Sequence, residues 1–293
     1  MRSLRGLAMG DAFGETWFHI RSDRVGQAIA DRDVSAGPWS WTDDTAMAIP
    51  LVRHLFRHDR IDPDELALAY AHTYTADRDR GYGPAMHRVL HGIADGEPWR
   101  DITVAQFGGR GSWGNGAAMR VAPLGVHYAD DLAVVAAEAA VQAVVTHANP
   151  EAVAGSVAVA IAAALIFNGV RGPDVLRAAA DAVPDTEVGN RLRRTVSFRA
   201  DSDPMHVAAM VGCGVEIAAF DTVPYALWCA VHHVGDLLEA LWITVTPGGD
   251  SDTTAAIVGG VLGAVSPLPV DWIDNVEPIY VEEPANPTAR DSR

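Results

Sequence analysis

Residues 152–167 read AVAGSVAVAIAAALIF and form the most apolar stretch of this 293-residue chain. Glu151 precedes the stretch and Asn168 follows it. The stretch is shorter than the ~20 apolar residues that a membrane-spanning helix needs. A helix of this length that is apolar on every side is typical of the buried centre of a large helical protein. The stretch therefore predicts the central helix of a multi-helix bundle.

Helical spacing of apolar residues continues on both sides of this central stretch. Residues 133–145 are also rich in Ala and Val, and HANP at 147–150 interrupts the helical pattern between the two stretches. So short an interruption predicts that the two helices pack as an antiparallel hairpin. Further helices are expected at residues 46–56, 64–74, 173–183, 191–199, 204–211, 225–234, 237–244 and 255–265. Convincing strand alternation is absent, so the sequence predicts an all-α, multi-helix bundle.

Two segments have a different character. Residues 92–116 are rich in glycine and contain Trp99, Phe107 and Trp113, and we expect a long functional loop there. Residues 183–203 carry mixed charges and predict a solvated surface helix with flanking turns. No linker divides the chain, so we expect one domain over residues 1–283 and a disordered polar tail at 284–293.

Composition limits the classes of function. The chain is 49% apolar and 20% charged, as in ordinary globular proteins. A formal charge of −16 disfavours general affinity for nucleic acid or for anionic membranes. It does not exclude a phosphate-bearing ligand, because a metal ion or a helix N-terminus supplies local positive potential. Cys213 and Cys229 lie in apolar surroundings and are expected to be buried thiols. No secretory signal opens the sequence, so we expect a cytoplasmic protein with no membrane partner.

Two acidic clusters suggest the chemistry. WTDDT at 41–45 and GGDSDTT at 248–254 each stand immediately before a predicted helix. One Asp or Thr at such a place is an ordinary cap for free backbone N–H groups. Four carboxylates with flanking threonines exceed what capping needs, and together they would offer the hard oxygen ligands that suit Mg²⁺ or Mn²⁺. The alternative is a pair of well-capped helices that never meet.

The second cluster has features of a ligand-binding turn. Asp250 and Asp252 are two residues apart and cannot share a helix face, but they can share a ligand from a turn. Gly248 and Gly249 would let that turn approach a ligand closely. The helix that follows contains three glycines, at 259, 260 and 263. Each lowers helix propensity by ~1 kcal/mol, which indicates that the helix lies very close to another element.

A third segment, GLAMGDAFGE at 6–15, repeats a small residue every four positions. Gly6, Gly10 and Gly14 would form one helix face that can contact the backbone of a neighbouring helix. Asp11 lies within the same segment. Its carboxylate either joins the acidic clusters or is hydrogen-bonded internally in a tightly packed helix.

Two glycine-rich loops lead into predicted helices, RGYGP at 80–84 and GSWGNG at 111–116. Backbone N–H groups in such loops can hold phosphate, although glycine-rich turns are common. Trp113 could stack on a base or a sugar, or could simply pack.

In combination these motifs resemble the ADP-ribosylglycohydrolase family. GLAMGDAFG, WTDDTAM, RGYG, GSWGNGAAMR, VTHANPEAVAG and GGDSDTTAAIVGGVLGA occur in that family's order, from about Gly6 to Ala264. The resemblance implies an all-α fold of that type, a dinuclear Mg²⁺ site, and hydrolysis of the bond between an ADP-ribosyl group and an acceptor. The acceptor, whether protein, nucleic acid or small molecule, is left open.

The resemblance also implies roles for individual residues. The positions that match metal ligands are Thr42, Asp43, Asp44, Asp250, Asp252 and Thr253. Gly81 and Gly83 match a diphosphate loop. The positions that match a ribose and phosphate loop are Gly111, Ser112, Trp113 and Gly114. His147 matches a position that contacts ADP-ribose, and its independent interpretation is a histidine favoured by a helix C-terminus.

One position departs from the family pattern. Many members have a glutamate four residues after the glycine that is Gly14 here, whereas this chain has Phe18. The nearest carboxylate is Glu15, which alternatively pairs with an arginine such as Arg21. Our hypothesis is that Glu15, or an aspartate beside the metals (Asp43 or Asp44), serves as the base, and that the substrate differs from the common serine and arginine conjugates.

Two other classes of protein were weighed against this one. HD at 58–59 and HHVGD at 232–236 superficially resemble histidine-aspartate phosphohydrolases, which are also helical and metal-dependent. The spaced histidines that such enzymes need are missing. The second alternative is a non-catalytic relative that binds ADP-ribose or a nucleotide and keeps the metal pocket. A metal-dependent turnover assay separates it from an enzyme.

Overall fold

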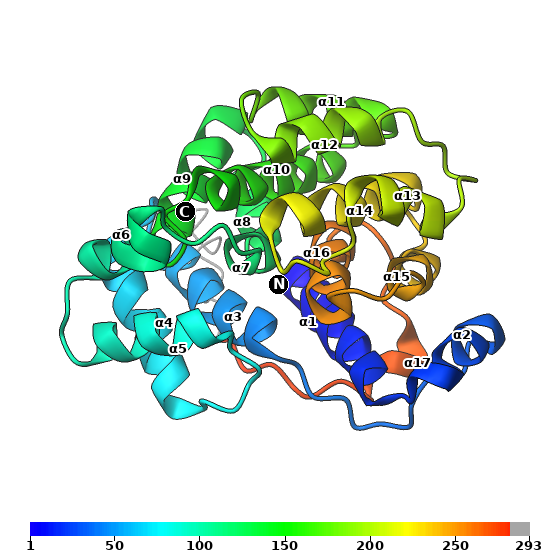
Figure 1. The fold of residues 1–293 in the computed structure, drawn as a ribbon, viewed down its shortest axis with the longest axis horizontal. Helices are drawn as coiled ribbons and strands as arrows, with labels where there is room; N and C mark the ends of the chain where they lie inside the picture. The colour runs from blue at the N-terminus through cyan, green and yellow to red at the C-terminus, as the bar shows by residue number, and fades with distance from the viewer. Residues whose placement is uncertain (282–293) are drawn as a thin grey trace, which may run out of the picture.

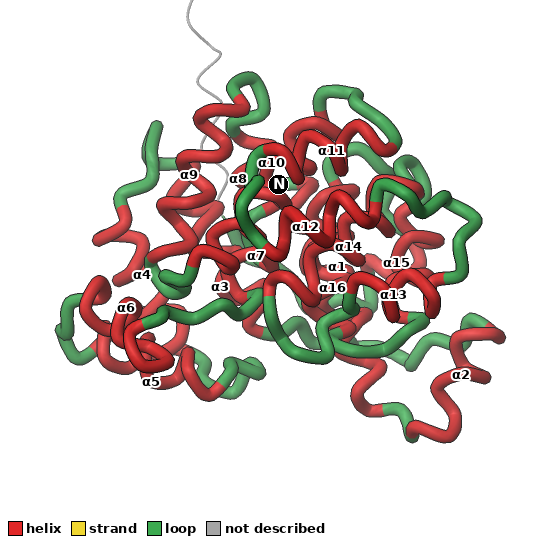
Figure 2. Tube along the Cα trace, turned by 45° about the horizontal axis from the view of Figure 1, so that its top comes forward, coloured by secondary structure: helices red, strands yellow, loops and turns green. Residues whose placement is uncertain are grey.

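The computed structural model describes residues 1–281, and within them the chain forms α-helices, one short 3-10 helix and no β-strand. Figure 2 shows helices joined by loops throughout this part of the chain. The predicted all-α class is therefore confirmed, while the predicted tail at 284–293 lies outside the described residues.

The helices follow one another along the described part of the chain. In chain order they are α1 (Arg2–Glu15), the 3-10 helix η1 (Thr16–His19), α2 (Ser22–Asp31), α3 (Asp43–Leu55), α4 (Pro63–Ala76), α5 (Pro84–Ala94), α6 (Trp99–Gly109), α7 (Gly116–Met119), α8 (Ala122–His127), α9 (Leu132–Val144), α10 (Pro150–Phe167), α11 (Pro173–Asp181), α12 (Glu187–Thr195), α13 (Pro204–Val211), α14 (Ala219–His232), α15 (Leu237–Val245), α16 (Ser251–Gly263) and α17 (Val270–Ile273).

Helix α10 is the central helix that the apolar stretch predicts. Asn149 caps its N-terminus by accepting a hydrogen bond from the Glu151 N–H, and Pro150 occupies the first turn. By length and hydropathy alone α10 could also cross a membrane, but 72% of it is buried inside the protein. It contacts α7, α8, α9, α11, α14 and α16, including the expected hairpin partner α9. Burial against so many helices explains why no face of α10 is polar.

Helices α1 and α16 cross with their backbones in contact. A Cβ atom on Gly10 would lie 2.0 Å from the Ala255 carbonyl oxygen, and one on Gly6 would lie 2.3 Å from the Gly259 oxygen. The two helices lie side by side in Figure 1, blue and orange. The small-residue face predicted from the sequence is confirmed. Because the helices are antiparallel, this crossing brings the end of α1 next to the beginning of α16.

The expected long loop at residues 92–116 is wrong in part, because α6 occupies its middle. Ile102 and Thr103 are buried, so this short helix is held by packing rather than by propensity. The end of α6 is kinked, and there Phe107, Gly108 and Gly109 all have positive φ. The predicted surface helix at 191–199 is present as α12 but begins earlier, since Thr186 caps it by accepting from the Gly189 N–H. Cys213 and Cys229 are buried free thiols, as expected.

Candidate functional site

The two acidic clusters meet at the N-termini of α3 and α16. Thr42 is the N-cap of α3, and Asp250 stands immediately before α16. Thr253 Oγ1 donates to Asp44 Oδ2 over 3.3 Å, although the two residues are 209 positions apart in sequence. Thr42, Asp44 and Thr253 are buried, whereas Asp43, Asp250 and Asp252 are half-buried. The cluster is therefore closed to solvent at Thr42, Asp44 and Thr253 and partly accessible at the other three carboxylates.

Asp11 of α1 fixes the beginning of α3 from behind. Its carboxylate accepts from the Thr42 N–H at 3.0 Å, the Thr42 hydroxyl at 2.9 Å, the Thr45 N–H at 3.0 Å and the Thr45 hydroxyl at 2.6 Å. The interpretation of Asp11 as an internally hydrogen-bonded residue is thus correct. Asp11 also faces the other acidic side chains. Sequence reasoning left Asp11 out of the site. Its position directly after Gly10, in the same glycine-rich segment of α1, was the available signal.

Burial and like charge raise the pKa of every carboxyl group in this cluster. Burial raises the pKa of Asp11 to about 6, and burial with the charges of Asp11 and Asp250 raises that of Asp43 to about 7. Asp44 and Asp252 have pKa values well above the usual range, by burial and then by neighbouring carboxylates. Burial likewise raises the pKa of Asp250.

One oxygen of the cluster has no partner. Asp44 Oδ1 is buried and makes no hydrogen bond. A buried carboxylate oxygen without a donor is costly, and a cation removes that cost. The donor set consists of carboxylate and hydroxyl oxygens, the ligands preferred by Mg²⁺ and Mn²⁺. The residues therefore fit a hard divalent ion.

The loop at 80–83 lies against the same cluster. A Cβ atom on Gly81 would come 3.7 Å from Asp43 Oδ1, and Gly81 has φ +85°, which favours glycine. Arg80 anchors the loop by donating to both Glu277 carboxylate oxygens at 2.7 Å, and its guanidinium stacks 3.7 Å above the Trp41 ring. Gly81 and Gly83 are exposed, and within residues 1–281 neither backbone N–H donates a hydrogen bond.

The second glycine-rich loop, 111–116, is tied to the cluster through Asn115. The Asn115 amide donates to Asp250 Oδ2 at 2.6 Å and to Thr222 Oγ1 at 2.9 Å. Gly111 has positive φ, and a Cβ there would lie 2.7 Å from the Asn149 nitrogen. Ser112 Oγ accepts from the Gly114 N–H at 3.2 Å. Asn115 is a second site residue that the sequence analysis did not single out.

Trp113 and His147 flank this loop on different sides. The half-buried Trp113 ring lies 4.7 Å, centroid to centroid, from the exposed Phe107 ring. The buried His147 ring lies beneath the loop, where a Cβ on Gly116 would come 2.7 Å from its Cε1 atom. Burial and the charge of Arg120 lower the pKa of His147 to about 3, so the imidazole is neutral.

Glu15 and Phe18 lie at the end of α1 and in η1. Glu15 pairs with His19 Nε2 at 3.2 Å rather than with an arginine. The preceding Gly14 packs on the Asp252 backbone, where an added Cβ would be 2.6 Å from the Asp252 Cα atom. Phe18 is 50% exposed. The end of α1, with Glu15, therefore lies beside the N-terminus of α16. Neither Glu15 nor Phe18 donates or accepts a hydrogen bond with the acidic cluster in the described part of the chain.

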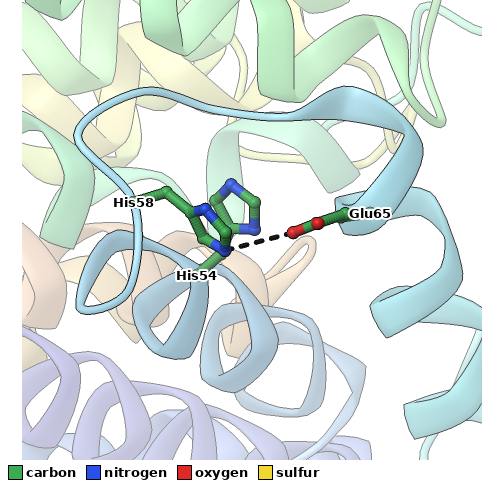
Figure 3. A group of neighbouring side chains, drawn as sticks. All are labelled: His54, His58 and Glu65. Atoms are coloured by element: carbon green, nitrogen blue, oxygen red, sulfur yellow. Dashed lines mark ion pairs between the residues drawn. The ribbon is translucent and has the colours of Figure 1, made fainter.

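Another group of ligand-type side chains lies at the opposite end of α3. Figure 3 shows His54, His58 and Glu65, whose ligand atoms all lie within 4.8 Å of one another, a spacing at which a metal ion could be held. In the structure each of these side chains already has a partner. His54 Nε2 accepts from the Asp62 N–H at 3.0 Å, and His58 Nε2 pairs with Glu65 at 3.1 Å. The group lines an open groove of about 1070 Å³.

The helical body brings carboxylates and two glycine-rich loops together, a combination that suits an enzyme acting on a phosphate-bearing ligand. A family model for the ADP-ribosylglycohydrolases matches residues 1–291, and the chain belongs to this family. It is accordingly a glycohydrolase enzyme.

Named relatives are similar over most of the chain. The mouse (Mus musculus) ADP-ribosylhydrolase ARH3 is 30% identical, covering 81% of this chain and 73% of the relative. The ADP-ribosylarginine hydrolase Tri1 of Pseudomonas putida is 28% identical, with coverage of 94% and 73%. A solved structure of an ADP-ribosylglycohydrolase-related protein complex aligns with a TM-score of 0.66 at 24% identity, covering 94% and 90% of the two chains. That alignment supports the fold.

Proposed function

We propose that this enzyme hydrolyses the bond between the anomeric carbon of an ADP-ribosyl group and its acceptor, releasing ADP-ribose, and that it requires a divalent metal. The observation that carries the proposal is the meeting of Asp43 and Asp44 with Asp250 and Asp252 in one cluster that contains a partnerless buried oxygen. The names of the relatives support the same reaction, since they describe hydrolases of ADP-ribosyl groups.

The metal-holding residues in this proposal are Thr42, Asp43, Asp44, Asp250, Asp252 and Thr253. Four carboxylates favour two ions over one, because a single divalent charge would leave the cluster negative. Mg²⁺ is the proposed metal, with Mn²⁺ as an alternative. When bound, the metal would supply positive charge that polarises water and orients ribose hydroxyls.

The loops provide the binding surface for the nucleotide part. Exposed backbone N–H groups of the loop at 80–83 suit a diphosphate, and the loop at 111–116 suits a ribose and phosphate. Trp113 offers a face on which an adenine or a sugar can stack. These loops hold the anomeric carbon next to the carboxylates, where positive charge develops in an oxocarbenium-like transition state.

A carboxylate must accept the proton of the attacking water. Asp43 has a pKa of about 7 in the absence of metal, and burial raises the pKa of Asp44 well above its usual range, but both also serve as proposed ligands. Glu15 is half-buried and lies beside the α16 end of the cluster. We propose Glu15 as the base if it leaves His19 when substrate binds, with Asp43 or Asp44 as the alternative.

Phe18 suggests an acceptor different from those of the named relatives. Its half-exposed ring on η1 cannot orient water or a leaving group as a carboxylate can. A ring there would instead make that side of the pocket drier, which favours an apolar or planar acceptor. Cytoplasmic localisation remains part of the proposal, consistent with the two free thiols.

A substrate panel tests the proposed function. ADP-ribosylated arginine, serine and nucleic acid are incubated with the protein and Mg²⁺, Mn²⁺ or a chelator, and released ADP-ribose is measured. Release that stops with the chelator is the expected result. No release from any conjugate, together with tight ADP-ribose binding, would favour the alternative of a non-catalytic relative.

Two variants then assign roles. Glu15→Gln should reduce turnover by ~10²-fold or more if Glu15 is the base, since positioned general bases contribute roughly 10²–10⁴-fold. Unchanged turnover with normal metal content would leave Asp43 or Asp44 as the base.

Trp113→Ala should weaken ADP-ribose binding by ~1–3 kcal/mol if the ring stacks on the ligand. Equal affinity in both proteins would make Trp113 a packing residue.

A further inference from the structure

Arg120 is a fully buried cation at the end of α7, behind the loop at 111–116. Its side chain is 0% exposed and makes no ion pair with a carboxylate in the described part of the chain. Its Nε atom donates to Gln142 Oε1 at 2.9 Å, and its Nη2 atom donates to the Gln142 carbonyl at 3.1 Å. The guanidinium also lies 4.3 Å from the centre of the Tyr70 ring. The charge of Asp43 acts on Arg120 from a distance, but no carboxylate of the described residues contacts the guanidinium. Burying a charge without a carboxylate in direct contact is expensive, so a role beyond packing is worth seeking.

A third hydrogen bond connects Arg120 to His147 through the hydroxyl of Thr146. Nη2 donates to Thr146 Oγ1 at 2.9 Å, and Thr146 Oγ1 lies 2.8 Å from His147 Nδ1. A threonine hydroxyl has a single hydrogen. The hydroxyl oxygen accepts from Arg120, and its hydrogen is directed to His147 Nδ1 because no other described residue offers an acceptor within reach. Thr146 is fully buried, and no other acceptor for its hydroxyl is present among residues 1–281.

This arrangement determines the proton on the imidazole. Nδ1 of His147 accepts from Thr146, so it carries no hydrogen. A neutral imidazole then carries its hydrogen on Nε2. The opposite tautomer would leave the buried Thr146 hydroxyl without an acceptor, which is unfavourable.

The Nε2 atom faces the glycine-rich loop. A Cβ atom on Gly116 would come 2.9 Å from Nε2, and one on Gly114 would come 3.4 Å from it. Nε2 makes no hydrogen bond to any described residue. A neutral N–H donor thus stands against the loop that, in the proposed function, holds a ribose and phosphate.

We propose that Arg120 and Thr146 are positioning residues, which fix His147 as the neutral Nε2–H tautomer and so present a hydrogen-bond donor to the oxygens of an ADP-ribosyl ligand. The choice of ligand rests on the proposed function, whereas the tautomer rests only on the contacts above. Direct contact of Arg120 with the ligand is not needed. Its charge also keeps the imidazole neutral, because it lowers the His147 pKa.

Nuclear magnetic resonance of ¹⁵N-histidine-labelled protein tests the tautomer without ligand. The His147 signals are identified by their loss in His147→Gln. In the wild type we expect a hydrogen on Nε2 and none on Nδ1 near neutral pH. Thr146→Val preserves the side-chain shape but removes the hydroxyl, and it should move His147 toward the Nδ1–H form. Thr146→Ser should restore the wild-type pattern.

A matched control separates positioning from folding. Thr195 is equally buried, and its hydroxyl donates to the Leu192 carbonyl at 2.6 Å within α12. Thr195→Val therefore makes the same chemical change away from His147, and it should leave the His147 signals unchanged. An unaltered tautomer in Thr146→Val, or an Nδ1–H tautomer in the wild type, would overturn the inference.

Binding of ADP-ribose, measured by calorimetry with Mg²⁺, provides the functional readout. Loss of one correctly directed hydrogen bond corresponds to about a tenfold weaker affinity, which we expect in Thr146→Val but not in Thr146→Ser or Thr195→Val. A tautomer change without an affinity change would overturn the role of His147 as a donor. If the wild type does not bind ADP-ribose, the proposed function fails, while the tautomer result still decides the role of Arg120 and Thr146.

Discussion

The two ends of α3 each gather side chains that could hold a metal ion, but their electrostatic situations are opposite. At the N-terminal end, carboxylates lie together, raise one another's pKa values and leave Asp44 Oδ1 without a partner. At the C-terminal end, His58 pairs with Glu65 and His54 is hydrogen-bonded to the backbone. Ligand type and spacing do not separate these two regions. Uncompensated charge does, and it supports our proposal that the acidic cluster is the metal site.

The two regions also differ in how they are held. The acidic cluster rests on the glycine contact between α1 and α16, where backbone meets backbone. The histidine group lines an open groove, and the Glu65 side chain is 58% exposed. A catalytic site must hold its geometry closely, and rigid elements serve that purpose better than an exposed helix end.

The largest expected effect is on metal binding. Asp252→Asn should lower Mg²⁺ affinity more than about a hundredfold, because even changes behind a metal's ligands cost roughly 10–100-fold. Calorimetry measures the affinity, and turnover should fall with it. His58→Ala is the control and should bind Mg²⁺ like the wild type. Unchanged Mg²⁺ affinity in Asp252→Asn would show that the acidic cluster is not the metal site.

The next effect concerns the support of the cluster. Gly10→Ala should destabilise the fold by about 3 kcal/mol, since an added methyl group would collide with the Ala255 carbonyl and overpacking costs typically 1–3 kcal/mol. Urea unfolding gives the free energy. Gly26 on α2 has no atom near its added Cβ, so Gly26→Ala should be neutral or slightly stabilising. Equal stability of the two variants would argue against a tight α1–α16 contact.

The two regions should respond to pH with opposite sign in metal-free protein. Asp11 and Asp43 have folded pKa values of about 6 and 7, above the ordinary 3.8, so the folded state holds more protons in that interval. Stability should therefore fall as pH rises from about 4 to 7, because these carboxyls repel one another in the folded state once they ionise. Burial lowers the pKa of His54, so below pH 6.5 the unfolded state binds a proton more readily than the folded state. At this residue the stability of the fold therefore falls as pH falls below 6.5.

Thermal unfolding across this pH range, with a chelator and then with Mg²⁺, checks the expectation. Mg²⁺ should remove most of the decline because it neutralises the carboxylates. The variant Asp44→Asn should flatten the metal-free profile. A decline that persists with saturating Mg²⁺ would place its origin outside the cluster.

The smallest effect is expected at the histidine group. Glu65→Gln removes one partner of an exposed ion pair, and such pairs contribute about 0.2–1 kcal/mol. Urea unfolding should show a change of that size, with Mg²⁺ affinity and turnover unaltered. A Zn²⁺ titration sharpens the result. Tight Zn²⁺ binding that survives Asp252→Asn and disappears in Glu65→Gln would make the histidine group a metal site as well.

Local pattern was enough to predict much of this protein. Residues 152–167 indicated the central helix because apolarity on every side has one common explanation in a chain of this composition. Gly6, Gly10 and Gly14 indicated a close helix contact because their spacing matches the helical period. The family motifs indicated the reaction. All of these features are carried by residues close together in sequence.

Tertiary structure alone decided which distant residues meet. That Asp44 and Thr253 lie within hydrogen-bonding distance depends on the α1–α16 crossing, which no local pattern specifies. Asn115 belongs to the site because its loop passes close enough to Asp250 for a hydrogen bond. Asp11 belongs to it because its carboxylate accepts hydrogen bonds from Thr42 and Thr45. Helix α6 was missed because packing overrides a glycine-rich composition. Sequence determines helix period and capping through neighbouring atoms, whereas charge, burial and pKa depend on groups that only the fold brings together.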